Sequence, residues 1–468
     1  MMKSILLMVL LSITIAYSYA QEKTDKHNFT IQQCIEYAKK NNVQVKNALL
    51  DIKIQEQVNR GVTSAAYPQL NGSVGYTYYN DIPVQSIPDF ISPAVYGVLT
   101  HEHVQNGQTG NGITAPGSYG IIPAQFGSKY VANGTLQLQQ LLFDGQVFVG
   151  LQARNTTLKF QQKAVEVTEE SIKVNIYKIY YQLAVSKSQI ELLDANIERI
   201  EKLLKDVKEI YKNGFAEQLD VDKLTVQLSN LKTEKEKVLN IVEIGYLGLK
   251  TLIGMPVKET LTLKDNITYD DIKSGLLTDT ASIYKNRKEY QYLELAKKLN
   301  EYNIKRYKLS YFPTIAAVGV YGKNAQRNKL TFFEKGDWYT TSYFGLNASI
   351  SLFDGFSKDS KIKQSKYELQ KTNNTIESFK LSVDNELSSA TLKFNSAIST
   401  VESQKRNMVL AEKVYDQTKK KFEAGTGSNT EINAAETDLK SAQTNYITAL
   451  YDAVIAKVDF LKATGKLP

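Results

Sequence analysis

Apolar residues recur every three or four positions along most of this chain, and this spacing predicts long amphipathic helices. The plainest heptad seam consists of Ile190, Leu193, Ile197, Ile200, Leu204, Val207 and Tyr211. A second heptad run follows Gly214 and continues to Leu252. Two such helices joined by a short glycine turn form an antiparallel coiled-coil hairpin, and the first helix would be roughly 100 Å long at 1.5 Å per residue.

Four shorter segments alternate apolar with small or polar residues, which predicts β-strands. They cover about 69–78, 131–143, 314–322 and 343–353, the length of strands that cross a membrane. The smallest single-chain membrane barrels have about eight strands, and an open sheet edge in lipid leaves backbone groups unsatisfied. We therefore expect other copies of the chain to complete the sheet.

A constant offset shows that the chain contains two copies of one unit. Gly214 returns as Gly425 and Gly254 as Gly465, each 211 positions later, and a Phe-Asp-Gly triplet occurs at 143–145 and again at 353–355. We place the first repeat at 21–255, with a helix at about 30–66 and a hairpin tip near 214. The second repeat covers 281–468, with a helix ending near 311 and a tip near 425; residues 256–280 form an equatorial connector.

The N-terminus has the features of a secretory signal peptide over residues 1–20. Lys3 precedes the apolar stretch 5–15, and Ser18-Tyr19-Ala20 is a small-x-small cleavage site. After residue 20 no stretch approaches the roughly 20 apolar residues of a transmembrane helix. These features predict export.

Composition and charge exclude several classes of function. The net charge of +8 over 468 residues comes from lysines spread along helical faces, not from the basic stripe of a nucleic-acid binder. The single Cys34 lies on an amphipathic helix start and is expected to be a buried thiol. With three histidines and no catalytic constellation, we expect neither an enzyme nor a cofactor or metal.

Residues 79–130 differ from the rest, because five of the nine prolines and many glycines fall there. This composition predicts a long irregular loop. It contains His101-Glu102-His103, but a loop pair without further clustered ligands is a weak indication of a metal site.

The order of these motifs resembles the TolC family of outer-membrane efflux and secretion channels, across essentially the whole mature chain. The matching features are Tyr67-Pro68-Gln69-Leu70, the Leu-Phe-Asp-Gly elbows at 142–145 and 352–355, and the turns at 213–215 and 424–426. The resemblance implies an α+β membrane protein that forms a homotrimer. Four transmembrane strands per chain would build a 12-stranded barrel, continued by a coiled-coil α-helical tunnel in the periplasm.

The resemblance also implies a function, localisation and partners. The chain would be the outer-membrane exit duct of a tripartite efflux pump that passively conducts small molecules, in contact with outer-membrane lipid. Its partners would be a periplasmic adaptor (membrane fusion protein) and an inner-membrane transporter of the RND, ABC or MFS type. An exit duct for type I protein secretion is one alternative, and a periplasmic coiled-coil scaffold without a pore is another.

Two groups of candidate residues follow from the resemblance. The adaptor would dock on the hairpin tips, formed by Asn213, Gly214, Phe215, Ala424, Gly425 and Thr426. Glu431 and Asp220, each six residues after a turn glycine, would line the narrow periplasmic entrance. Local structure alone would also explain both groups, because glycine permits the left-handed turn and a carboxylate stabilises the first turn of a helix.

The two copies of the hairpin differ in the size of their seams. Adding 211 to the first seam gives smaller and more polar residues, among them Gln404, Ala411 and Thr418. Smaller side chains bury less apolar area. We therefore expect the second hairpin to be the looser one and the gate to lie in it.

Overall fold

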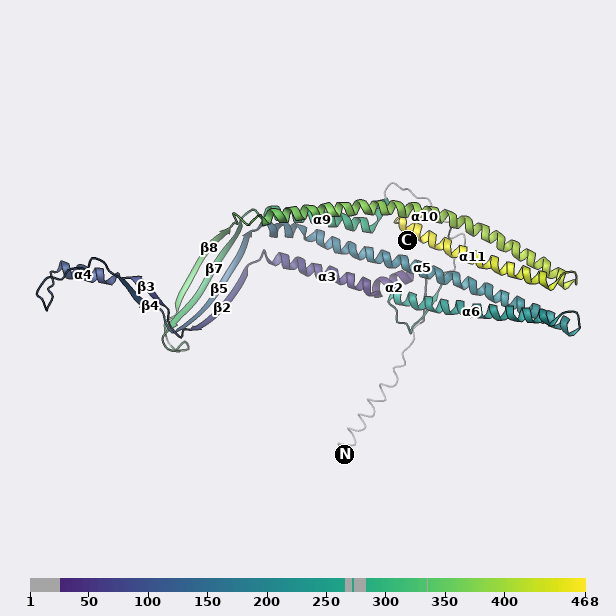
Figure 1. Ribbon diagram of the computed structural model, residues 1–468, viewed down its shortest axis with the longest axis horizontal. Helices are drawn as coiled ribbons and strands as arrows, with labels where there is room; N and C mark the ends of the chain where they lie inside the picture. Colours follow the sequence, from purple (N-terminus) through teal and green to yellow (C-terminus); the bar gives the residue numbers. More distant parts are fainter. Residues whose placement is uncertain (1–25, 266–271, 273–282, 335) are drawn as a thin grey trace, which may run out of the picture. The chain divides into compact units, whose positions relative to one another are not determined.

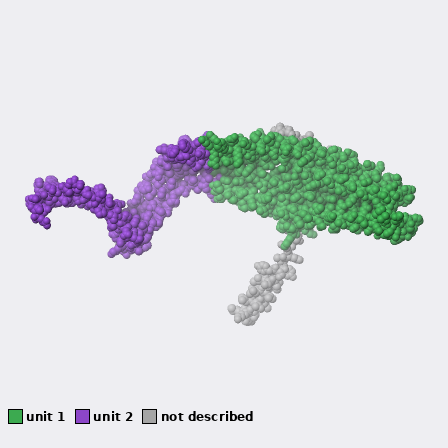
Figure 2. Space-filling model, in the orientation of Figure 1, with its two compact units in different colours: residues 1–58, 153–303, 363–468 green, residues 59–152, 304–362 purple. Residues whose placement is uncertain are grey.

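The computed structural model describes residues 26–265, 272, 283–334 and 336–468. The chain divides into two compact units, shown in different colours in Figure 2. Unit 1 contains residues 1–58, 153–303 and 363–468, and unit 2 contains residues 59–152 and 304–362. The predicted signal peptide and part of the predicted connector lie outside the described residues. None of the described helices combines the length and apolarity needed to cross a membrane.

Two helical hairpins dominate unit 1 (Figure 1). The first pairs α5 (Gly145–Lys212) with α6 (Gln218–Ile253), and the second pairs α10 (Ser357–Glu423) with α11 (Asn429–Ala463). Their helices have 68 and 36 residues in the first hairpin and 67 and 35 in the second. This near-identity of length is what a duplicated unit produces.

The two hairpins share a hydrophobic core near their tips. One cluster of buried side chains draws residues from all four helices, among them Ile200 on α5, Leu224 on α6, Tyr415 on α10 and Leu439 on α11. All four are nearly inaccessible to solvent. The heptad seams therefore pack each hairpin internally and also join one hairpin to the other.

The beginning of the described chain consists of a short strand and two helices. β1 (Lys26–Phe29) pairs in parallel with β6 (Thr260–Leu263), and α2 (Ile31–Asn41) is followed by α3 (Val43–Ser64). The single helix expected over 30–66 is thus interrupted at Asn42. The Asn42 carboxamide oxygen accepts the backbone N–H groups of Gln44 and Val45 at 2.7 and 3.2 Å, so it caps a new helix start. Cys34 is fully buried in α2, as expected.

The second repeat begins with the short helix α8 (Ile283–Asn286) and the longer α9 (Lys288–Leu309). The buried Arg287 separates them. Its guanidinium donates to Glu386 Oε2 and to the Lys462 carbonyl oxygen, each at 3.1 Å. Arg287 thereby ties the start of the second repeat to the last turn of α11.

Unit 2 contains a four-stranded antiparallel sheet in the order β2-β5-β7-β8 (Figure 1). The strands are β2 (Gln69–Tyr78), β5 (Tyr130–Phe143), β7 (Thr314–Arg327) and β8 (Tyr339–Ser349). β7 is longer than the expected 314–322, because it pairs with β5 as far as Arg327, opposite Tyr130. β8 starts and ends four residues before the expected 343–353, since Tyr339 pairs with Asn324 and Ser349 with Thr314. Among the described strands, β2 and β8 each have one hydrogen-bonded neighbour.

The repeated Phe-Asp-Gly elbow connects a strand to a long helix in both copies, but its glycine has a different role in each. In the first copy the Asp144 carboxylate accepts the N–H groups of Gln146 and Val147, and a Cβ on Gly145 would lie 2.7 Å from the Leu309 carbonyl oxygen. In the second copy Gly355 has open space around it and a φ of +64°. Close approach requires the first glycine, and a left-handed backbone favours the second.

Residues 79–130 contain regular structure, which corrects the expectation of an irregular loop. β3 (Val84–Pro88) pairs antiparallel with β4 (Ile121–Gln125), and α4 (Ile91–His101) lies between them in the sequence. The Asp89 carboxylate accepts the N–H groups of Ile91 and Ser92 at 3.1 and 2.8 Å. Pro93 lies in the first turn, where proline is tolerated, so a helix forms despite the composition.

Candidate functional site

The first hairpin tip is a tight turn closed by backbone hydrogen bonds. Gly214 has a φ of +85°. Its N–H donates to the Tyr211 carbonyl oxygen at 2.8 Å, and the Phe215 N–H donates to the Ile210 carbonyl oxygen at 3.0 Å. This pair of bonds is the Schellman motif, in which a left-handed residue satisfies the last carbonyls of a helix.

The second tip repeats the same geometry. Gly425 has a φ of +72°, its N–H donates to the Phe422 carbonyl oxygen, and the Thr426 N–H donates to the Lys421 carbonyl oxygen, both at 3.0 Å. The Thr426 hydroxyl donates to the same Lys421 oxygen at 3.2 Å. Both turn glycines therefore have the structural role that a left-handed helix end requires.

Side chains around the turns differ in what they offer a partner. The Asn213 carboxamide donates to the Glu209 carbonyl oxygen at 2.7 Å, so it closes the helix end. Phe215 presents the largest apolar surface, because its ring is 85 % exposed. Ala424 and Thr426 are also exposed. A protruding ring on a rigid turn is a suitable anchor for a partner protein.

The two candidate entrance carboxylates both belong to helix starts. The Ser428 N–H donates to Glu431 Oε2 at 3.3 Å, and the Glu431 N–H donates to the Ser428 hydroxyl at 3.2 Å, which completes a capping box. Asp220 accepts the Glu217 N–H at 3.3 Å in the first hairpin. Glu431 is exposed and Asp220 half-buried. The local role of both carboxylates is therefore established by geometry, and the Ser-x-x-Glu spacing at 428–431 is a sequence signal for it.

A buried polar layer lies behind the tips, and the sequence pattern does not predict it. Glu436 on α11 is 1 % exposed, and burial raises the pKa of its carboxyl group. The half-buried Arg199 on α5 opposes this rise through its charge. The Arg199 guanidinium also lies 5.2 Å from the ring centre of Tyr415 on α10, and burial raises the pKa of that phenol to about 12.

The layer continues through two amides. Arg199 donates to Asn196 Oδ1 at 2.8 Å, and Asn196 donates in turn to Gln443 Oε1 at 2.7 Å. Glu436 Oε2 and the Tyr415 hydroxyl have no hydrogen-bond partner among the described residues. Because Glu436 directly follows the seam position Ala435, its place in the heptad resembles that of a solvated flank residue, and no sequence signal indicates its burial.

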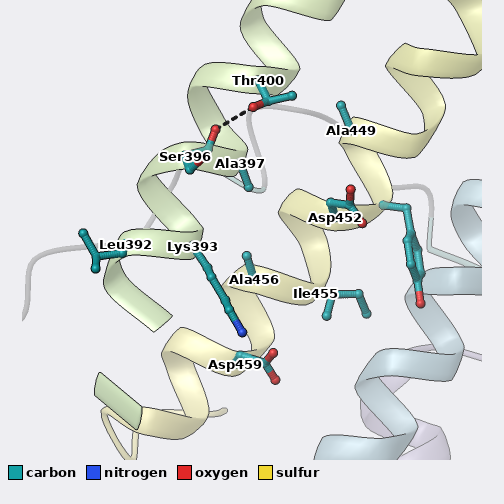
Figure 3. A pocket seen from close by; sticks show the side chains of 11 residues that line it. Leu392, Lys393, Ser396, Ala397, Thr400, Ala449, Asp452, Ile455, Ala456 and Asp459 are labelled. Atoms are coloured by element: carbon teal, nitrogen blue, oxygen red, sulfur yellow. Dashed lines mark hydrogen bonds between the residues drawn. The ribbon is translucent and has the colours of Figure 1, made fainter. Parts of the chain in front are cut away.

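A groove of about 590 Å³ lies between α10 and α11 (Figure 3). Lys393 and Thr400 line it from α10, and Asp452 and Asp459 line it from α11. Figure 3 shows Lys393 directed toward Asp459. Asp459 forms an ion pair with Lys178 on α5 at 2.7 Å. The groove therefore presents a mixed charged and apolar surface on the second hairpin.

The four-stranded sheet has one mainly apolar face that is exposed to solvent. Strand pairing places the following side chains on this face: Leu70, Val74 and Tyr76 of β2; Leu136 and Leu138 of β5; Tyr321 of β7; Phe344 and Leu346 of β8. All are exposed, and Val74 is 92 % exposed. On β2 and β5 the opposite face is polar, with Ser73, Thr77, Asn133, Thr135 and Gln137. A lipid-facing wall with a polar interior has this pattern.

Aromatic rings gather at the end of the sheet where β2 ends and β5 begins. Tyr78 lies 5.0 Å from Tyr130, and Tyr76 meets Phe332 edge-on at 5.9 Å. Phe332 also lies 6.2 Å from Trp338. Tyrosine and tryptophan favour the boundary between membrane and water, so this end of the sheet suits one membrane surface.

No cluster of three metal-binding side chains occurs among the residues that the structure describes. His101 ends α4, and His103, at a φ of +48°, follows it in a turn. This part of the chain therefore gives no support to a metal site.

Comparison with known proteins supports the resemblance noted in the sequence. Residues 282–466 match the family model described as outer membrane efflux protein. The outer membrane protein TolC of Vibrio cholerae is 18% identical over 337 residues, which cover 71% of this chain and 76% of that protein. TolC of Escherichia coli is 22% identical over 371 residues, covering 77% and 74%.

Solved structures show the same fold. The crystal structure of CusC, in a study of transmembrane channel formation, matches with a TM-score of 0.74 at 14% identity and covers 93% of this chain and 92% of that one. The open state of the Neisseria gonorrhoeae MtrE outer membrane channel matches with a TM-score of 0.71 at 15% identity, covering 93% and 89%.

The described chain thus has the α+β fold of the outer-membrane channels with a helical tunnel, which confirms the expected fold class. The chain is similar to the outer-membrane protein TolC, and residues 282–466, in its second repeat, match the outer membrane efflux protein family. The expected localisation in the outer membrane is likewise confirmed. The family is one of efflux channels and not of enzymes.

Proposed function

We propose that this protein is the outer-membrane exit duct of a tripartite efflux pump, and that it conducts small molecules passively without catalysing a reaction. The observation that carries the proposal is the four-stranded sheet, which exposes one apolar face and has one neighbour for each outer strand. Both outer strands need partners in lipid. Three copies would supply twelve strands, so we propose a homotrimer whose sheets close into one barrel.

The proposed partners act at the hairpin tips. A periplasmic adaptor would dock on the exposed residues of the two turns, with Phe215 as the main apolar contact. The adaptor would connect the duct to an inner-membrane transporter, whose own specificity would select the transported compounds. The resemblance to TolC and the rigid Schellman turns support this arrangement.

The duct is tested by conductance and by efflux. Purified protein from the outer membrane is expected to migrate as a heat-sensitive trimer and to give single channels in planar bilayers. Deletion of the gene should make the host more sensitive to toxic small molecules. Absence of channels from correctly assembled trimers would overturn the proposal, and normal drug resistance combined with loss of an exported protein would favour secretion instead.

We further propose that Glu431, with Asp220 in the first hairpin, contributes negative charge to the periplasmic entrance. Glu431→Gln separates this effect of charge from the capping role. The variant removes the negative charge, but its amide oxygen can still accept the Ser428 N–H. This variant should lose cation preference in bilayers while keeping its thermal stability. Glu431→Ala should lose both, with a stability cost of about 0.5–1.5 kcal/mol for the lost hydrogen bond to the Ser428 N–H. Unchanged cation preference in both variants would remove Glu431 from the entrance.

A further inference from the structure

The insertion between β2 and β5 carries an apolar helix face that the proposed duct function does not explain. Phe90, directly before α4, and Ile91, Ala94, Val95 and Val98 on α4 are spaced so that they share one side of the helix. We call these five residues the α4 stripe. All five are exposed, with Phe90 at 64 % and Val98 at 62 %.

The opposite side of α4 packs within the insertion. Ser92, Tyr96, Leu99 and Thr100 are half-buried. The ring of Tyr96 lies 6.1 Å from that of Tyr119 in the segment leading to β4, and the Thr100 hydroxyl donates to the Tyr96 carbonyl oxygen at 2.7 Å. The helix therefore turns its more polar side inward and its apolar side outward. A buried valine, isoleucine or phenylalanine gains about 1.5–3 kcal/mol over an exposed one, so covering the stripe is favourable.

A membrane surface is a poor match for this helix. Helices that lie on membranes carry lysine or arginine on the polar face, where the cations meet lipid headgroups. The polar side of α4 has Ser92, Tyr96 and Thr100 instead. Between residues 79 and 130 the sole lysine or arginine is Lys129, next to the start of β5. The charge distribution thus favours a protein surface over lipid.

A second copy of the same chain matches the stripe. The stripe has no ionisable side chain, so identical stripes can meet without like-charge repulsion. The insertion is joined to the sheet at Tyr78 and Tyr130, which pair with each other. If three sheets close into one barrel, three insertions are held at high effective concentration, and the same residues of each copy lie at equivalent positions around a common threefold axis.

We propose that the α4 stripe is a contact between copies of this chain, in which three α4 helices pack on one another in the trimer. This inference rests on the trimer in the proposed function. The insertion then adds an interface of its own to the one formed by the sheet edges.

The test is cross-linking of the protein in outer-membrane vesicles, with Val95→Cys oxidised by copper phenanthroline. Native Cys34 is fully buried and burial raises the pKa of its thiol to about 12, so it stays unreactive. Gln108→Cys, exposed in the same insertion but outside the stripe, is the matched control. Val95→Cys should give about fivefold more covalently linked copies than Gln108→Cys, as expected for cysteines held at a shared interface.

A second measurement does not depend on disulfide formation. Val95→Lys should lower the temperature at which the trimer dissociates, whereas Gln108→Lys should leave it unchanged. Equal cross-linking in the two cysteine variants would overturn the inference. Quenching by brominated lipid of a fluorophore attached to the Val95→Cys variant would also overturn it and would identify lipid as the occupant. Heat-sensitive trimers of the unmodified chain in the same gels separate this outcome from failure of the trimer itself.

Discussion

Glu436 is buried in the folded protein, although its position in the heptad resembles that of a solvent-exposed residue. Its carboxyl group lies in the core shared by the two hairpins, where Oε2 has no hydrogen-bond partner among the described residues. Burial favours the neutral form of the carboxyl group, so Glu436 binds its proton more tightly in the folded protein than in the unfolded chain. The positive charge of Arg199 reduces this rise in the pKa of Glu436 without reversing it.

The direction of the pKa shift fixes the pH dependence of stability. The contribution of Glu436 to the stability of the folded protein is fully present below the ordinary pKa of 4.5. It is lost as the pH rises through the raised pKa that Glu436 has in the folded state. Glu436→Gln should therefore stabilise the helices at neutral pH by about 1–2 kcal/mol, the range for relieving a poorly satisfied buried group. The gain should shrink as the pH approaches 4.5.

Thermal unfolding followed by circular dichroism in detergent, at several pH values, measures this effect. Glu412→Gln, on the exposed surface of α10, is the control and should change little at any pH. A destabilised Glu436→Gln protein at neutral pH would mean that the attraction between the Glu436 carboxylate and the charge of Arg199 outweighs the cost of burial.

At the scale of elements, some residues of the hairpin turns maintain the turn itself, and others are available to bind a partner. Gly214 and Gly425 are fixed by the left-handed geometry, so their replacement strains the turn whatever the partner does. Phe215 is different, because its ring is exposed and takes no part in the hydrogen bonds of the turn, which backbone groups make. Substitution at Phe215 therefore tests docking without altering the fold.

Phe215→Glu should weaken adaptor binding by about 30-fold or more, which corresponds to the loss of one interface anchor of at least 2 kcal/mol. Co-purification of the adaptor and the drug sensitivity of the host measure this loss, while trimer assembly should be unaffected. Asn230→Glu introduces the same charge at an exposed position on α6, about three turns from the tip, and should behave like the unmodified protein. Normal adaptor binding by Phe215→Glu would exclude this tip as the docking site.

At the scale of the whole molecule, the decisive feature is the difference between the two faces of the sheet. Val74 and Ser73 are neighbours on β2 and point to opposite faces. If the apolar face contacts lipid, Val74→Lys should destabilise insertion by about 2–4 kcal/mol near the middle of the membrane. Ser73→Lys, on the polar face, should insert normally.

The measurement is the fraction of heat-sensitive trimer recovered from the outer membrane, together with urea titration in lipid vesicles. Equal behaviour of the two lysine variants would mean that lipid does not contact this face. Because both variants carry the same new charge in the same strand, a general effect of charge would not separate them.

Much of the fold could be predicted because periodicity is a local property. The heptad spacing predicts long helices with turns near 214 and 425, and the structure has Gly214 and Gly425 in left-handed turns between α5 and α6 and between α10 and α11. Alternation predicts the strands but misplaces the ends of β7 and β8, because strand ends depend on the length of the partner strand. Composition is misleading at residues 91–101, where Asp89 caps a helix that the surrounding prolines and glycines conceal.

The sequence by itself determined the duplication, the hairpins, the alternating strands and the resemblance to TolC, since each follows from spacing along the chain. Only the tertiary structure decided which side chains meet. It placed Glu436 beside a core from four helices, engaged Glu431 and Asp220 in helix caps, and turned the apolar side of α4 outward. Burial and pairing depend on residues far apart in the sequence, and heptad position alone does not specify them.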